Sequence, residues 1–219
     1  MRFWLLALAG CQKLLDLEQV PDPPDASPPP PPCVMPLLSD SFDTDPPCGP
    51  IGFADDDPTT TTTSENGRLA IHPGTTMDQT RGGCIGSKMA FTAESGVFMH
   101  VTTLPDGSEY QDLVLDWVGS TMVTTVSWNA SDIIVQDGTT TFADTLFDPA
   151  KTTWVRVRPS DDGTAIQAET SADGLDWNMF GTDPIVPPAS VGILFHGGTF
   201  AMESAPRTIY FDDLNVCPL

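Results

Sequence analysis

Apolar and polar residues alternate with a period of two through most of the chain beyond residue 37. The clearest examples are the segments 97–102, 112–118, 122–128 and 154–158. In a β-strand successive side chains point to opposite faces, so this pattern predicts strands with one buried face. No window of a dozen residues carries a helical stripe, and turn residues recur about every 8–14 residues. The sequence predicts about twelve antiparallel strands in an all-β, two-sheet β-sandwich.

Two local patterns refine this prediction. Asp161-Asp162-Gly163 separates two alternating segments and is typical of a tight hairpin turn. Near the C-terminus, the apolar residues Ile209 and Phe211 occupy odd-numbered positions, whereas Leu214 and Val216 occupy even-numbered positions. The apolar phase therefore slips at Asp212-Asp213, as a β-bulge requires.

The first eleven residues differ from the remainder. A short apolar run after Arg2 is far below the roughly 20 residues needed to span a bilayer, so it is typical of a targeting segment. It ends in Leu8-Ala9-Gly10-Cys11, which resembles a bacterial lipobox. The resemblance implies that Cys11 is lipidated and becomes the mature N-terminus. The alternatives are an ordinary signal peptide and a chance apolar start.

The sequence thus predicts three segments: a lipoprotein signal over residues 1–10, a tether over 11–36 and a β-sandwich over 37–219. Residues 21–36 contain nine prolines and lack the donors for a helix or a sheet. A polyproline II stalk there would extend about 3.1 Å per residue, or roughly 45 Å. Within the sandwich, the threonine run 59–64 is interpreted as a loop insertion.

Charge excludes some partners. The chain has 30 acidic and 9 basic residues and a formal net charge of −21. Such a surface repels phosphate backbones and anionic lipid headgroups, which argues against nucleic acid and against electrostatic membrane docking. Gln12 stands where an Asp would favour retention at the inner membrane. We therefore expect an exported protein, lipid-anchored to the bacterial outer membrane or cell surface.

Several short motifs resemble one superfamily. They are the opening Leu38-Ser39-Asp40-Ser41-Phe42-Asp43, the turn Asn66-Gly67-Arg68-Leu69, the strand beginning at Trp154, the turn Ser171-Ala172-Asp173-Gly174-Leu175-Asp176-Trp177, and the final segment 209–216. In this order they are similar to the concanavalin A-like lectin/glucanase superfamily, particularly its laminin-G-like jelly rolls. The resemblance implies two stacked curved sheets, a face or loops that commonly bind glycans, and often a structural calcium ion.

Catalytic signatures are missing from the sequence. The glucanase branch of that superfamily carries closely spaced acidic residues on one strand, and the glutamates here, Glu65, Glu94, Glu109, Glu169 and Glu203, never have that spacing. Asp112 and Asp116 share a strand face, but about 13 Å of strand separates them. We therefore expect no enzymatic activity and no catalytic residue.

The remaining cysteines are Cys33, Cys48, Cys84 and Cys217. In an oxidising compartment four cysteines suggest two disulfides, for which three connectivities exist. In the jelly rolls that the chain resembles, the first and last strands are neighbours. We therefore expect Cys33–Cys217 to clamp those strands and Cys48–Cys84 to tie back the long acidic loop.

The same neighbourhood would bring Asp40 and Asp43 close to Asp212 and Asp213. Four carboxylates there could hold Ca²⁺, which prefers oxygen ligands. The alternative is that these aspartates only solvate a sheet edge and limit aggregation.

One strand suggests a ligand site. Val155 and Val157 should face the core, which leaves Trp154, Arg156 and Arg158 on the other face. An indole beside planar donors suits a sugar ring. The alternative is structural: a return strand would place Arg156 opposite Glu169 and Arg158 opposite Gln167 as cross-strand pairs.

Together these observations predict a surface-anchored, non-catalytic binding or adhesion module for carbohydrate or another envelope polymer. The alternative is a structural or partner-binding envelope lipoprotein without a small ligand, and a glycoside hydrolase is the less favoured third class.

Overall fold

The computed structural model describes residues 42, 52–55, 58–76, 79–85, 88–94, 96–105, 108–129 and 131–215. The chain divides into two units, Met1–Pro32 and Cys33–Leu219, and all described residues belong to the second. The predicted signal over 1–10 and tether over 11–36 therefore lie outside the described residues.

The described part consists of strands and connecting turns, with no helix. The strands are β1 (Gly52–Asp55), β2 (Thr61–Ser64), β3 (Leu69–His72), β4 (Thr80–Ile85), β5 (Met89–Ala90), β6 (Val97–His100), β7 (Glu109–Trp117), β8 (Val123–Asn129), β9 (Asp132–Asp137), β10 (Thr140–Leu146), β11 (Trp154–Pro159), β12 (Ile166–Ser171), β13 (Asn178–Asp183), β14 (Ser190–Thr199) and β15 (Ile209–Phe211). Within the described residues no helix is long and apolar enough to cross a membrane.

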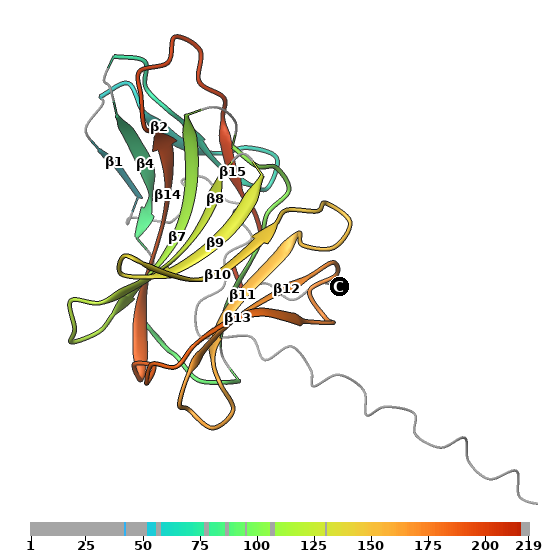
Figure 1. The fold of residues 1–219 in the computed structure, drawn as a ribbon. Helices are drawn as coiled ribbons and strands as arrows, with labels where there is room; N and C mark the ends of the chain where they lie inside the picture. The colour runs from blue at the N-terminus through green and yellow to red at the C-terminus, as the bar shows by residue number, and fades with distance from the viewer. Residues whose placement is uncertain are drawn as a thin grey trace, which may run out of the picture. The chain divides into compact units, whose positions relative to one another are not determined.

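Twelve strands form one antiparallel sheet in the order β1-β4-β14-β7-β8-β9-β10-β13-β12-β11-β6, with β5 paired to β14. A smaller sheet has the order β15-β3-β2. Figure 1 shows how the large sheet curls along this order. The half around β7, β8 and β14 and the half around β6 and β11 therefore form the two layers of a sandwich, which confirms the predicted all-β fold class.

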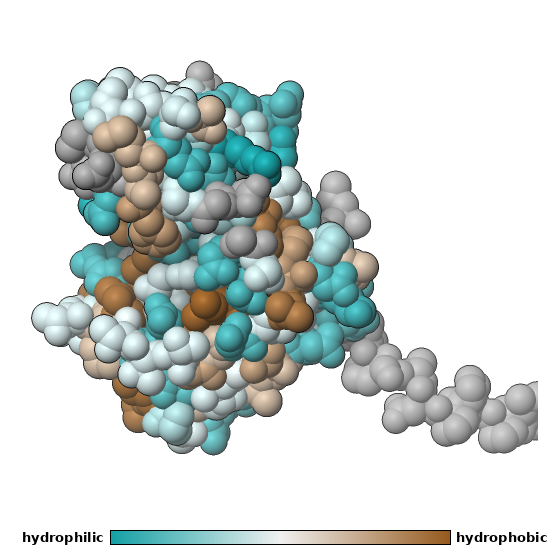
Figure 2. Space-filling view, turned by 45° about the horizontal axis from the view of Figure 1, so that its top comes forward, coloured by the Kyte–Doolittle hydropathy of each residue, from teal (hydrophilic) through white to brown (hydrophobic). Residues whose placement is uncertain are grey.

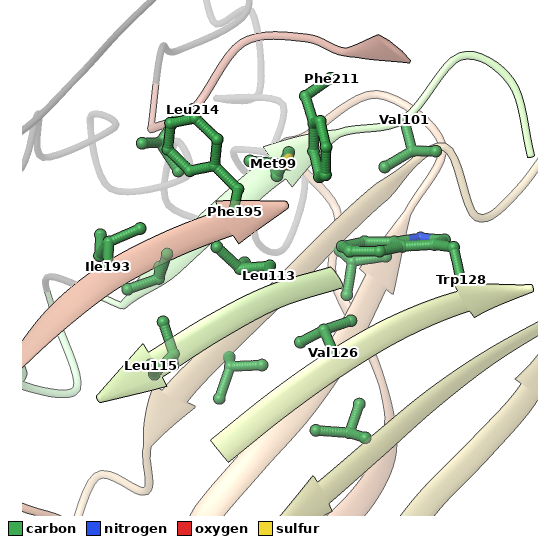
Figure 3. Close-up of a cluster of buried hydrophobic side chains, with 14 of the residues drawn as sticks. Met99, Val101, Leu113, Leu115, Val126, Trp128, Ile193, Phe195, Phe211 and Leu214 are labelled. Carbon is green, nitrogen blue, oxygen red and sulfur yellow. The ribbon is translucent and has the colours of Figure 1, made fainter. Parts of the chain in front are cut away.

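The core lies between the two layers. Leu113 and Leu115 of β7, Val126 and Trp128 of β8, and Phe195 of β14 are buried on one side. Buried side chains of β6, β11 and β15 face them across the core, as Figure 3 shows for Met99 and Phe211. Burying such a side chain contributes about 1.5–3 kcal/mol, so this alternation determines which face of each strand turns inward.

The predicted hairpin is confirmed. β11 and β12 pair antiparallel on either side of the Asp161-Asp162-Gly163 turn, and Gly163 has a φ of 69°. The threonine run differs from its interpretation as a loop. Thr61–Ser64 is strand β2, which pairs with β3 in the register Thr61↔His72. Threonine is β-branched and favours extended backbone, so a neighbouring strand is enough to order the run.

The C-terminal change of apolar phase is also confirmed. Ile209, Phe211 and Leu214 are all buried, although Leu214 has the opposite parity. The reversal occurs because Asp213 has a φ of 39° and Asn215 a φ of 53°, both in the left-handed region. Before this turn, Asp212 forms an isolated antiparallel bridge with His100 at the end of β6. The last described segment thus joins the edge of the large sheet.

Candidate functional site

The cross-strand pairs that make up the structural alternative for strand β11 are present. Arg156 lies opposite Glu169 and Arg158 opposite Gln167, in the predicted register. Glu169 is buried and accepts hydrogen bonds from Nε of Arg156 at 2.6 Å and Nε of Arg158 at 3.1 Å. Both guanidinium groups therefore share the carboxylate of Glu169, and Arg158 also pairs with Asp161 at 2.7 Å.

Trp154 does not offer an open indole face. It is 6% exposed, and the ring of His100 stacks on it with 4.5 Å between centroids and 13° between planes. Trp177 covers Arg156 instead, with the guanidinium carbon 4.2 Å from the ring centroid. Trp154 is enclosed because edge strand β6 pairs with β11 and sets His100 beside it, a pairing that the sequence pattern does not reveal.

A different polar group lies on the outer face of the large sheet, away from the core. β14 pairs with β7 so that His196 lies opposite Asp112, and β8 places Ser127 on the other side of Asp112. Nε2 of His196 is 3.8 Å from Oδ2 of Asp112, which is too long for a hydrogen bond. The pair therefore presents an imidazole nitrogen and a carboxylate oxygen side by side.

Burial changes the charge of both groups. Desolvation raises the pKa of Asp112 from 3.8 to about 6, although a hydrogen bond from Ser127 acts in the opposite direction. Desolvation, and then the positive charge of Arg81, lowers the pKa of His196 from 6.5 to about 4. Near pH 7 Asp112 is thus an anion and His196 a neutral imidazole, so the two do not form an ion pair.

Aromatic rings extend this polar pair. Tyr110, two residues before Asp112 on the same face, meets the ring of His196 edge-on with centroids 5.6 Å apart. Phe200 stacks on Tyr110 at 4.4 Å and is itself 62% exposed. We call the four residues Asp112, His196, Tyr110 and Phe200 the outer-face site. It combines a carboxylate, an imidazole and an exposed aromatic ring.

Close approach of the strands shapes this face. Gly83 of β4 lies opposite His196, and a Cβ atom at Gly83 would come within 2.1 Å of the carbonyl oxygen of Phe195. Only glycine fits there without moving the backbone. On the face drawn in Figure 2, apolar residues occur as small groups between hydrophilic ones.

The predicted calcium ligands are partly described. Asp40 and Asp43 lie outside the described residues, whereas Asp212 and Asp213 lie beside His100. Oδ2 of each aspartate is 3.7 Å from Nδ1 of His100. His100 was not among the calcium ligands predicted from the sequence, although the predicted bulge at Asp212-Asp213 indicates that the chain redirects side chains at this point.

A cavity of about 530 Å³ lies where the loop after β6, the start of β7 and the segment 207–210 meet. Gln111 is among its lining residues, donates a hydrogen bond to the carbonyl of Tyr210 and leaves its buried Oε1 without a hydrogen-bond partner. This end cavity is a second place where a small polar ligand could be accommodated.

Of the predicted covalent sites, Cys11, Cys33, Cys48 and Cys217 lie outside the described residues. Cys84 is buried on β4 and is disulfide-bonded. The two predicted pairings, Cys33–Cys217 and Cys48–Cys84, stay predictions.

No protein-family model and no curated protein matches the chain. Among solved structures, the metal-free form of lectin I-B4 from Griffonia simplicifolia aligns with a TM-score of 0.51 and 9% identity, over 81% of this chain and 97% of that chain. A Bacillus subtilis protein of unknown function with a galectin-like fold aligns with a TM-score of 0.53 and 10% identity, over 82% of this chain and 94% of that chain. The fold is a lectin-like jelly roll. At such low identity the likeness concerns the fold alone.

Proposed function

We propose that this chain is a lipid-anchored, exported lipoprotein whose jelly roll is a non-catalytic binding module for carbohydrate or a similar envelope polymer. We place its ligand on the outer-face site. The observation that carries the proposal is the spacing of His196 Nε2 and Asp112 Oδ2, which are 3.8 Å apart.

That spacing suits a hydroxyl group. A hydroxyl oxygen can lie about 2.8 Å from both atoms at once, donating its hydrogen to the carboxylate and accepting one from the imidazole. Hydrogen bonds to an ionised carboxylate are roughly twice as strong as neutral ones. A carboxylate beside a neutral imidazole therefore matches the hydroxyl groups of a polyol.

The exposed ring of Phe200 complements this polar contact. The less polar face of a sugar ring can pack on an aromatic plane, and Phe200 is held in place by its stack on Tyr110. By contrast, Trp154, Arg156 and Arg158 are already engaged with His100 and Glu169. The outer face is therefore the better ligand site of the two.

A glycan and polysaccharide array tests the proposal. The full chain carrying Cys11→Ser would be used, since this change removes the predicted lipid site. We expect binding to at least one neutral glycan class, at least tenfold weaker in Phe200→Ala. A chain that is folded and binds no glycan would instead support the structural or partner-binding alternative.

Two further arms separate the remaining alternatives. Incubation with any bound polysaccharide, followed by analysis of reducing ends, tests for hydrolysis, for which the raised pKa of Asp112 would suit a general acid. We expect no cleavage. Loss of binding in Gln111→Leu with full binding in Phe200→Ala would place the ligand in the end cavity and contradict the outer-face site.

A further inference from the structure

The cluster of His100, Asp212 and Asp213 at the junction between β6 and the C-terminal segment has the donor set of a metal site. One ligand atom from each residue lies within 4.8 Å of the other two. Nδ1 of His100 is buried and has no hydrogen-bond partner. A buried polar atom without a hydrogen-bond partner lowers the stability of the folded state. The imidazole of His100 therefore contributes little to folding stability here unless Nδ1 binds another group.

The distances suit an ion between the three side chains. Nδ1 of His100 is 3.7 Å from Oδ2 of Asp212 and 3.7 Å from Oδ2 of Asp213. Bonds of about 2.0–2.2 Å around a tetrahedral zinc ion place neighbouring ligands roughly 3.3–3.5 Å apart. The two histidine–carboxylate distances therefore need to shorten by only a few tenths of an ångström to match a zinc coordination sphere.

The backbone holds the three ligands in place. His100 and Asp212 exchange two backbone hydrogen bonds, with N–O distances of 3.2 Å and 3.3 Å. Consecutive residues of a regular strand point to opposite faces. Because Asp213 has a left-handed φ of 39°, its carboxylate instead reaches the same imidazole as that of Asp212.

The imidazole is also fixed from one side. Trp154 stacks on it, which limits rotation of the ring. The three side chains remain partly exposed, at 24%, 18% and 31%, although Nδ1 of His100 itself is buried. The arrangement is thus largely formed before any ion binds.

The donor chemistry does not fit the calcium ion that the superfamily resemblance implies. Calcium takes six to eight oxygen ligands, whereas an imidazole nitrogen suits zinc and related first-row ions. We propose that His100, Asp212 and Asp213 form a site for Zn²⁺ or a similar divalent transition metal, which ties the C-terminal segment to edge strand β6. This site is independent of the glycan site on the outer face.

Calorimetric titration of the full Cys11→Ser chain, stripped with EDTA and dialysed, tests the proposal with Zn²⁺ and Ca²⁺ in separate runs. We expect one zinc ion per chain and at least a hundredfold preference for zinc over calcium. His100→Gln and Asp212→Asn should each weaken zinc binding at least tenfold. The matched control is His72→Gln, which removes another imidazole that lies beside a carboxylate, with Nε2 of His72 2.8 Å from Oε1 of Glu65. This variant should keep a zinc affinity within twofold of the parent.

Trp154 supplies a second readout in the unaltered site. Co²⁺ in this site would lie next to the imidazole that stacks on Trp154 and should quench its fluorescence. The quenching should disappear in Trp154→Phe and on addition of excess zinc. Tighter binding of calcium than of zinc, or zinc binding and Co²⁺ quenching that persist unchanged in both His100→Gln and Asp212→Asn, would overturn the proposal.

Discussion

Asp112 and His196 carry opposite pKa shifts, and the two shifts make opposite contributions to stability. The pKa of Asp112 is raised from 3.8 to about 6, so the folded state binds the proton more tightly and loses stability as pH rises through that window. The pKa of His196 is lowered from 6.5 to about 4, so its contribution is present above 6.5 and is lost as pH falls through 4.

Between pH 4 and 6 these two contributions nearly cancel in the parent protein. Asp112→Asn leaves the histidine contribution, so its free energy of unfolding should rise by about 3 kcal/mol from pH 4 to 6.5. His196→Gln leaves the aspartate contribution, so its free energy of unfolding should fall by about 3 kcal/mol from pH 4 to 6. Urea unfolding followed by tryptophan fluorescence measures both, and parallel pH profiles in the parent and the two variants would refute the assignment.

Glu169 holds two arginines at once, which makes it more important than an ordinary surface carboxylate. Glu169→Gln should lower the free energy of unfolding by about 3–5 kcal/mol, because two partly buried guanidinium groups lose their common counter-ion. Asp161→Asn is the control: Asp161 also pairs with Arg158, but its side chain is 88% exposed, so its loss should cost under about 1 kcal/mol. Equal costs in chemical denaturation would contradict this account.

At the scale of elements, the side chain of Asn215 stabilises the junction between β6 and the C-terminal segment. Asn215 is fully buried, its Oδ1 accepts a hydrogen bond from the backbone N–H of Phe98 at 2.8 Å, and its own N–H donates to the carbonyl of Phe98. Asn215→Ala should lower the free energy of unfolding by about 2–4 kcal/mol, since it leaves a buried donor unpaired and puts alanine in the left-handed region.

Asn66→Ala separates these two causes. Asn66 has a φ of 54° in an exposed turn, so this variant has the backbone cost without the loss of a buried hydrogen bond. Its free energy of unfolding should fall by about 1–2 kcal/mol. Thermal or chemical unfolding of both variants measures the two effects. A cost for Asn215→Ala no larger than that for Asn66→Ala would show that the hydrogen bond to β6 contributes little.

The elements themselves were largely predictable, because alternation is a local property. The segments around Leu113, Val126 and Val155 are strands with the predicted faces buried. The hairpin register of Arg156 with Glu169 was predictable because a tight turn fixes it. Strand neighbours far apart in sequence are set by how whole strands pack, and no local pattern encodes them.

The candidate sites were missed for that reason. Asp112 and His196 come from β7 and β14, and His100 meets Asp212 through an isolated bridge. Each of these residues can be read from the sequence, but the residue that it lies beside in the fold cannot. The exposure of Trp154 was mispredicted because β6, which covers it with His100, is paired across a long stretch of chain.

At the scale of the whole molecule, the predicted lipid anchor at Cys11 and the proposed ligand site lie in different parts of the chain, so each can be tested separately. Cys11→Ser should shift the protein from the membrane fraction to the soluble fraction or stall its processing, because lipidation contributes about 0.8 kcal/mol per buried methylene. Fractionation with and without detergent measures this. A Cys11→Ser protein that stays with membranes as the parent does would exclude the lipoprotein interpretation.

The outer-face site is the central claim, and a ligand titration of two matched variants tests it most directly. Asp112 and Asp116 lie on the same face of β7, and Asp116 is exposed. For the best glycan, calorimetry should give at least tenfold weaker binding to Asp112→Asn and an affinity within twofold of the parent for Asp116→Asn. Equal affinity of the folded Asp112→Asn chain and the parent would contradict the account.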